Sequence, residues 1–252
     1  MFLLEDEMRK FGMALLCMVI AMIGTTDAQT TILDDFSGPI NFSQTVVLDT
    51  GDLTTSNTST LQIVGGVGQV DTTVQDDIEQ SAWIFSGQSL AIGDSLLLDV
   101  AHNGGNQDIG IYVGNTAPTF NVREDYLISF VRNGGNALNS EFSVNTPGGT
   151  TGGFGVPGAA GAVASVFITR AAFDEYDLGF VDITGASFVE NTRTGTGIDA
   201  SVIGLYTDIR GTGTLGDIDN FRIVSPSSIP EPASMLVLGL VGGVVTLRRK
   251  KR

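Results

Sequence analysis

Cysteine and histidine are almost absent from this 252-residue chain. The single cysteine, Cys17, lies near the N-terminus, so residues 29–229 have no thiol for a disulfide bond or a cysteine-based metal site. His102 is the only histidine, which excludes a His-rich metal centre. A folded body of this composition must be stabilised by core packing alone.

Positive charge is also scarce in the middle of the chain. Residues 29–229 carry 23 Asp and Glu against six Arg and no Lys, a net charge of −17. Nucleic acid and anionic lipid bind to clustered cations, so neither is an expected partner of this region. Acidity of this degree keeps a secreted protein soluble. Cation binding, or repulsion from acidic polysaccharide, is the functional alternative.

The N-terminus has the pattern of a signal peptide over residues 1–28. Met8-Arg9-Lys10 opens a basic region, residues 11–23 are apolar, and Thr26-Asp27-Ala28 forms a small-x-small cleavage site. Acidic residues at positions 5–7 do not suit such a basic region. The pattern therefore predicts translation from Met8 rather than Met1, and export of the body.

The C-terminus combines a proline break, a short apolar stretch and a basic end. Pro230 and Pro232 favour extended backbone, so a new unit begins after them. The uncharged residues 233–247 would form a helix of about 22 Å, against a hydrocarbon core of ~30 Å. The pattern predicts a single transmembrane helix whose basic cluster stays in the cytoplasm while the body lies outside. That cluster is Arg248, Arg249, Lys250, Lys251 and Arg252.

Residues 228–252, with the tripeptide Pro230-Glu231-Pro232, resemble the PEP-CTERM sorting signal of exopolysaccharide-producing Gram-negative bacteria. The same segment is catalogued as an "ice-binding protein C-terminal" domain, a label that implies no ice binding by itself. The resemblance implies that an exosortase recognises the tripeptide and removes the tail. It also implies transient anchoring in the inner membrane, followed by release or attachment at the cell surface.

The body, residues 29–227, shows the period-2 pattern of β-strands almost throughout. Short strands separated by Gly, Asn, Asp and Thr clusters predict one all-β domain, a jelly-roll β-sandwich, flanked by the two terminal helices. The Gly-rich residues 148–161 are predicted to form an exposed loop. The predicted strands are residues 45–48, 61–64, 82–85, 96–100, 109–113, 126–131, 141–144, 164–169, 178–183, 187–189, 201–206 and 218–224.

One tetrapeptide occurs twice between predicted strands. Asn-Gly-Gly-Asn stands at residues 103–106 and again at residues 133–136. Asn-Gly steps tolerate the left-handed backbone of tight hairpins. The repeat therefore predicts two equivalent hairpin turns, with His102 as an exposed turn residue beside the first.

The two ends of the body resemble those of concanavalin A-like, or laminin-G-like, sandwiches. The resemblance lies in residues 34–36, 203–206 and 216–223, and it implies that the first and last strands lie side by side. Carboxylate and amide oxygens from both ends would then be neighbours, and calcium is bound by oxygen ligands alone. The candidate calcium ligands are Asp34, Asp35, Asp217, Asp219 and Asn220; turn formation by the same side chains is the alternative.

A hydrolase on this fold would resemble its relatives in a Glu-x-Asp-x-x-Glu strand, because retaining chemistry needs two carboxylates about 5 Å apart. The nearest match begins at Glu175 and Asp177, but Phe180 occupies the position of the second glutamate. A serine relay is not indicated either, because no Gly-x-Ser-x-Gly occurs. These observations favour a protein that is not an enzyme.

Aromatic side chains are the usual stacking platforms for sugars. Trp83 is the only tryptophan, and its neighbours Ile84 and Phe85 favour a place in the core. The four tyrosines, which show no grouping in the sequence, are Tyr112, Tyr126, Tyr176 and Tyr206.

Three functions remain open from the sequence. The favoured one is an exported, surface-sorted, non-enzymatic structural or matrix protein, associated with exopolysaccharide through a lectin-like sandwich. The second is a secreted glycan-active hydrolase on the concanavalin A-like fold. The third is an ice-binding or adhesion module, suggested by alternate threonines at 192, 194 and 196 and at 212 and 214, although intervening glycines favour loops.

Overall fold

The computed structural model describes residues 28–49, 59–72, 79–102, 108–116, 126–132, 141–146, 149–155, 163–209 and 213–226. Within these ranges, no helix has the length and apolarity needed to cross a membrane. The predicted span at 233–247 and most of the predicted signal peptide lie outside them. The chain divides into two units, residues 30–225 and residues 1–29 with 226–252, and the strands below belong almost entirely to the first.

Fifteen strands make up the described part of this unit. Their bounds are β1 Gln29–Asp34, β2 Phe42–Asp49, β3 Ser59–Val64, β4 Val67–Thr72, β5 Glu79–Phe85, β6 Ser95–His102, β7 Asp108–Gly114, β8 Tyr126–Arg132, β9 Glu141–Thr146, β10 Gly149–Gly155, β11 Val163–Ala172, β12 Glu175–Asp182, β13 Ser187–Thr194, β14 Val202–Ile209 and β15 Gly213–Ser225.

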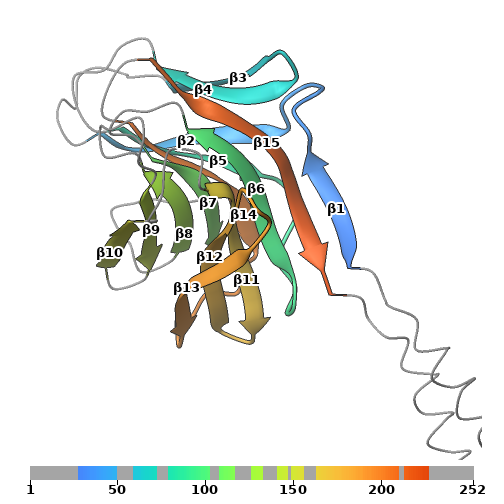
Figure 1. Cartoon of the computed structure of the whole chain (residues 1–252), viewed down its shortest axis with the longest axis vertical. Helices are drawn as coiled ribbons and strands as arrows, with labels where there is room; N and C mark the ends of the chain where they lie inside the picture. The colour runs from blue at the N-terminus through green and yellow to red at the C-terminus, as the bar shows by residue number, and fades with distance from the viewer. Residues whose placement is uncertain are drawn as a thin grey trace, which may run out of the picture. The chain divides into compact units, whose positions relative to one another are not determined.

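The strands form two sheets (Figure 1). The eight-stranded sheet has the order β13-β12-β11-β6-β15-β4-β3, with β1 pairing beside β15, and the seven-stranded sheet has the order β10-β9-β8-β7-β14-β5-β2. The pairs β11–β12, β6–β15 and β7–β14 are antiparallel, as is typical of sandwiches. The all-β sandwich predicted from the sequence is confirmed.

The main core lies between the two sheets. Alternate residues of the seven-stranded sheet enter it, such as Ile111 on β7 and Leu205 on β14, and they meet Leu98 on β6 and Ile168 on β11. Trp83 is 2% exposed and belongs to this core, as its neighbours indicated. Strand alternation thus places one row of apolar side chains inward from each sheet.

The seven-stranded sheet has a second apolar cluster, made by the residues that alternate with the core-facing ones. Tyr112 and Tyr126 lie 5.6 Å apart between ring centroids, and Phe130 and Tyr206 lie 5.4 Å apart. Gly110 lies in register between Tyr206 and Phe130, where a Cβ atom would stand 2.0 Å from the Ser129 carbonyl oxygen. This face therefore needs glycine between its aromatic rings.

Three strands were missed by the sequence pattern, namely β1, β4 and β10. The predicted loop over residues 148–161 is wrong in its first half, because β10 pairs there with β9. Gly and Thr dominate this strand, so it lacks the alternating apolar pattern from which strands are predicted. Backbone pairing with β9 defines it instead.

The two Asn-Gly-Gly-Asn segments, for which equivalent hairpin turns were predicted, lie outside the described residues. The strands that flank the first, β6 and β7, belong to different sheets, whereas β8 and β9, which flank the second, are paired. His102 is not a turn residue, because it ends β6 and pairs with Gly216 on β15.

The first and last strands lie side by side, as the resemblance of the chain ends implied. β1 pairs with β15, and Figure 1 shows the two running alongside each other. This pairing brings the loop after β1 to the edge of the eight-stranded sheet.

Candidate functional site

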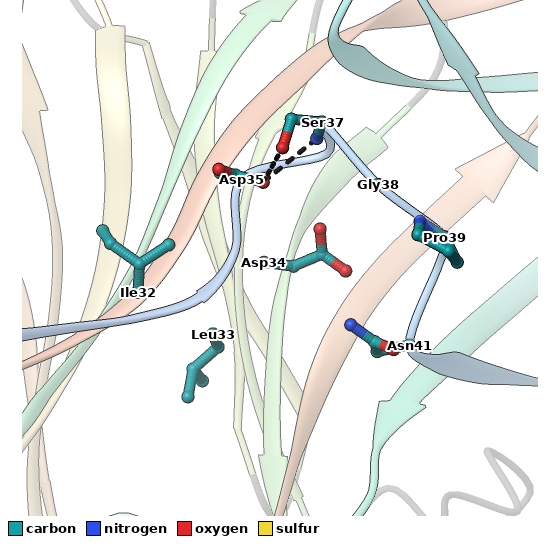
Figure 2. A pocket seen from close by; sticks show the side chains of 8 residues that line it. All are labelled: Ile32, Leu33, Asp34, Asp35, Ser37, Gly38, Pro39 and Asn41. Atoms are coloured by element: carbon teal, nitrogen blue, oxygen red, sulfur yellow. Dashed lines mark hydrogen bonds between the residues drawn. The ribbon is translucent and has the colours of Figure 1, made fainter.

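The end of β1 and the loop that follows it line an open hollow of about 400 Å³ (Figure 2). Residues 32–35, 37–39 and 41 line it. Asp34 is the last residue of β1, and the turn-forming run Ser37-Gly38-Pro39 carries the chain back toward β2. Two of the predicted calcium ligands, Asp34 and Asp35, therefore belong to one hollow.

Asp34 is the most enclosed polar group of the hollow, with 6% of its surface exposed. Its Oδ1 atom accepts a hydrogen bond from the backbone N–H of Phe36 at 2.7 Å. Its Oδ2 atom is buried and has no hydrogen-bond partner within the described part of the chain. Buried carboxylate oxygens in folded proteins are nearly always paired, so this oxygen calls for an explanation.

Asp35 has the opposite environment, because it is exposed and its Oδ1 atom takes part in a local turn. Its Oδ1 atom accepts hydrogen bonds from the Ser37 hydroxyl at 2.7 Å and from the Ser37 backbone N–H at 3.0 Å. These two bonds, the hydroxyl first, lower the pKa of the Asp35 carboxyl. Asp35 is therefore a carboxylate at neutral pH.

Phe36 fixes the loop between the two aspartates. Its side chain is fully buried, and its ring stacks on Phe42 with centroids 6.1 Å apart and planes 4° apart. A Cβ atom at Gly68 of β4 would lie 2.6 Å from the ring, so only glycine leaves room for it. The backbone of Phe36 has φ of 52°, which a bulky residue adopts only when the surrounding structure holds it.

The predicted ligands on the last strand point to other partners. Asp217 accepts a hydrogen bond from the Gln69 amide at 2.6 Å, and Asp219 accepts one from the backbone N–H of Asn220 at 2.7 Å. The Asn220 amide donates to Asp99 on β6 at 3.0 Å. The five predicted residues are thus divided between the hollow and β15.

Within the described ranges, no group of three or more His, Cys, Asp or Glu side chains is placed to hold a metal ion. The lining of the hollow includes the oxygen-bearing side chains of Asp34, Asp35, Ser37 and Asn41, of which Asp35 and Ser37 are hydrogen-bonded to each other. These are all oxygen donors, which suit a hard cation such as Ca²⁺.

The hydrolase-like segment on β12 is structural where it is described. Asp177 accepts a hydrogen bond from the Thr192 hydroxyl at 2.5 Å, and Phe180 is in the core. Glu175 pairs with Thr194 of β13 at the start of the strand. The buried ring of Phe180 thus occupies the position of the second glutamate in the hydrolase pattern.

The tyrosines do group together, contrary to their scatter in the sequence. Tyr112, Tyr126 and Tyr206 share the second cluster, and Tyr176 lies in the main core. Each is at most 2% exposed, so none presents a ring face to a sugar. The Tyr176 hydroxyl donates to the Ile198 carbonyl at 2.7 Å, and burial raises the pKa of this tyrosine.

The threonines of the ice-binding hypothesis are split between a strand and a loop. Thr192 and Thr194 belong to β13, whereas Thr196 follows it and donates to Asp174 at 2.6 Å. Thr214 lies on β15. Thr212 lies outside the described residues, as do the tripeptide at 230–232 and the basic cluster at 248–252.

Ser37, Gly38, Pro39 and Asn41 were missed as site residues. The signal in the sequence is the turn-forming Ser-Gly-Pro run directly after two aspartates, because such a run folds the chain back over them.

No family model and no curated protein matches this chain. Among solved structures it is similar to a legume lectin-like domain from Entamoeba histolytica, with a TM-score of 0.47 and 9% identity over 73% of this chain and 88% of that one. It is also similar to a lectin from Bauhinia forficata in complex with GalNAc, with a TM-score of 0.48 and 6% identity over 80% and 99% of the two chains. A protein of unknown function with a galectin-like fold from Bacillus subtilis has a TM-score of 0.47 and 8% identity, over 73% and 89%.

Proposed function

We propose that this chain is an exported, non-enzymatic surface protein that is sorted through its C-terminal tail and associates with extracellular polysaccharide. The observation that carries the proposal is the run of Pro230-Glu231-Pro232, an uncharged stretch and five terminal cations. A signal-peptide pattern at the other end agrees with it. The expected route is the inner membrane first, with a cytoplasmic C-terminus, and then the cell surface or medium.

The properties of the body suit such a destination. It has no cysteine that could be oxidised and no cation cluster for nucleic acid, and its net charge of −17 favours solubility. The described sandwich buries its tryptophan and tyrosines, so polysaccharide contact would depend on polar surface groups rather than ring stacking.

Fractionation of a producing cell tests the sorting part of this proposal. Medium, outer-membrane and inner-membrane fractions are compared by mass spectrometry in cells with and without the exosortase. Tail-less protein in the medium or outer membrane of the first cells only is the expected result. A Glu231→Ala variant should accumulate uncleaved in the inner membrane, and an Asp182→Asn variant in a surface turn should be processed normally. Cleavage that ignores both exosortase and Glu231 would contradict the proposal.

A glycan array tests the polysaccharide part separately. The purified full-length chain is applied to neutral and acidic bacterial polysaccharides, with and without chelator. Retention on at least one neutral polysaccharide is expected, because a body of net charge −17 is repelled by acidic chains. Retention on none would remove the polysaccharide from the proposal and leave the sorting untouched.

A further inference from the structure

Both chain ends of the sandwich lie at one end of the eight-stranded sheet. β15 runs to Ser225, and its Val224 pairs with Ser95, the first residue of β6. Figure 1 shows β1 running alongside β15 in the opposite direction, so β1 begins where β15 ends. The two segments with membrane-directed patterns, the signal peptide and the C-terminal tail, are therefore joined to the sandwich at the same end.

The same end carries two exposed apolar side chains on short connections between strands. β11 ends and β12 begins there, because Thr169 near the end of β11 pairs with Ser95, and the turn between these strands exposes 80% of Phe173. The connection that leads into β6 exposes 56% of Ile92. Two apolar tips are thus presented at the end from which the chain continues to the predicted membrane span.

Hydrogen bonds hold both connections in place. The carboxylate of Asp174 in the β11–β12 turn accepts hydrogen bonds from the Thr196 hydroxyl at 2.6 Å and from the Gly197 backbone N–H at 2.7 Å. In the connection before β6, the backbone N–H of Gly93 donates to the Arg170 carbonyl of β11 at 2.7 Å. The two apolar side chains therefore stand on a fixed surface, which lowers the ordering cost of binding to a partner.

The length of chain before the predicted membrane span limits how far this end can lie from a bilayer. Residues 226–232 separate Ser225 from Ala233, and even fully extended they cover only about 25 Å. As a helix, residues 233–247 would be about 22 Å long, shorter than a ~30 Å hydrocarbon core, so the flanking residues are drawn toward the bilayer. While the span is inserted, the end with Phe173 is thus kept close to the membrane surface.

We propose that, while the tail anchors the chain, this end of the sandwich rests on the outer face of the inner membrane, with Phe173 and Ile92 in the headgroup layer of zwitterionic lipid. The inference rests on the proposed sorting through the tail. Aromatic and aliphatic tips on a fixed surface suit the boundary between headgroups and hydrocarbon. Because the short tether keeps lipid at a high local concentration, two side chains are enough for contact.

Negative charge at the same end determines which lipids fit. Asp94, Asp174 and Asp199 lie on the connections that meet there, and the Thr196 hydroxyl lowers the pKa of the Asp174 carboxyl. The Arg170 side chain of this end donates to backbone carbonyls. Anionic headgroups are therefore repelled. The contact depends on the tether and ends when the tail is removed.

Quenching of tryptophan emission by brominated lipid tests the contact. The full-length chain is reconstituted into phosphatidylcholine vesicles with and without bromine on the acyl chains near the headgroups. Trp83 is buried in the core and gives the common background. Phe173→Trp and Ile92→Trp should each add emission that bromine quenches. The matched control is Ile183→Trp, because Ile183 is also exposed but lies in the turn at the other end of the eight-residue β12, about 26 Å away.

Flotation of the vesicles on a density gradient separates a failure of the membrane span from a failure of the contact. A chain that does not float would remove the membrane stage of the proposed function, and this contact with it. In a chain that floats, bromine should quench the emission added by Phe173→Trp at least about threefold more strongly than that added by Ile183→Trp. Equal quenching in these two variants would overturn the contact and leave the sorting untouched.

Lipid charge provides the second comparison. Vesicles of equal parts phosphatidylcholine and phosphatidylglycerol should reduce the quenching in Phe173→Trp and Ile92→Trp, because the acidic end is repelled by an anionic surface. Stronger quenching in these vesicles would overturn the preference for zwitterionic lipid.

Discussion

Asp34 and Asp99 lie on strands that both pair with β15, and they differ in burial and in the number of their hydrogen-bond partners. Asp99 keeps 32% of its side chain exposed, yet it has three side-chain partners. Its Oδ1 atom accepts from the Ser165 hydroxyl at 2.6 Å and from Arg222 at 2.8 Å, and its Oδ2 atom accepts from Asn220. Asp34 is far more buried and has one backbone N–H.

The contrast shows which of the two carboxylates has its hydrogen-bond partners within the described sandwich. Burial raises the cost of a charge, so the more buried carboxylate should have the larger set of partners. The opposite order holds at Asp34, whose Oδ2 atom has no hydrogen-bond partner among the described residues. Asp99, by contrast, is a structural carboxylate that joins β6, β11 and β15.

Removing the ring of Phe36, the residue between the two aspartates, should have the largest effect, because the ring is fully buried. Phe36→Ala is expected to lower the free energy of unfolding by about 3–5 kcal/mol, the usual loss for a fully buried phenylalanine. Urea unfolding of the full-length chain in chelator measures it. Phe173→Ala, at a ring that is 80% exposed, is the matched control and should stay within about 0.5 kcal/mol. Equal losses in both variants would mean that Phe36 does not anchor the loop.

Neutralising each carboxylate in turn compares the two groups directly. Asp99→Asn should cost about 1–2 kcal/mol, because it leaves Arg222 without its ion pair at a partly exposed site. Asp34→Asn should cost less than about 0.5 kcal/mol, or stabilise the fold, because asparagine keeps an oxygen for the Phe36 N–H and the Oδ2 atom that it replaces has no hydrogen-bond partner among the described residues.

Urea midpoints of the wild type and of both variants give the comparison. A large loss for Asp34→Asn in chelator would show that the carboxylate already has its full set of partners.

Asn220 tests how much one partner contributes to Asp99. Its backbone has φ of 48°, in the bulge of β15, and its amide bonds to Asp99. Asn220→Ala should lower the free energy of unfolding by about 1–2 kcal/mol, because the left-handed backbone is unfavourable for alanine and the hydrogen bond is lost. Asn220→Gly loses the bond alone and should be less destabilised by about 1 kcal/mol. Identical losses would place the whole effect in the hydrogen bond.

The sequence predicts the sandwich well where apolar residues alternate. β7 and β11 have such runs, and β7 was expected within one residue of its bounds and β11 within three. β10 reads Gly-Thr-Thr-Gly-Gly-Phe-Gly and was expected as a loop, although Pro147-Gly148 before it is a turn signal for a hairpin with β9. The alternation of apolar residues does not predict a strand such as β10, which is defined by its backbone pairing with β9.

The candidate site was only half predictable for a similar reason. Asp34 and Asp35 are conspicuous as paired acids, but a sequence reveals neither the burial of Asp34 nor the left-handed conformation of Phe36. The partners of Asp99 lie 66, 121 and 123 positions away along the chain. Contacts at such separations follow from sheet order, so the sequence could not assign Asn220 to Asp99 rather than to a metal.

The smallest expected effect concerns Asp35, the exposed neighbour of Asp34. Its pKa is below the ordinary value of 3.8, mainly because of the Ser37 hydroxyl. Because the folded-state pKa is the lower one, Asp35 adds stability above about pH 4, and this contribution is lost as the pH falls through the folded pKa. Ser37→Ala should raise the pKa of Asp35 toward 3.8. The part of the fall in Tm at acid pH that is due to Asp35 should then become smaller.

Carboxyl NMR titration in chelator, from about pH 5 to about pH 2, follows the two groups separately. Asp182 is the matched internal control, because the hydroxyl of Thr184 lowers its pKa in a turn of the same kind. Ser37→Ala should leave the Asp182 titration unchanged while Asp35 shifts. If both titrate as in the wild type, the hydroxyl of Ser37 is not what holds Asp35 ionised, and the negative charge beside the hollow has another cause.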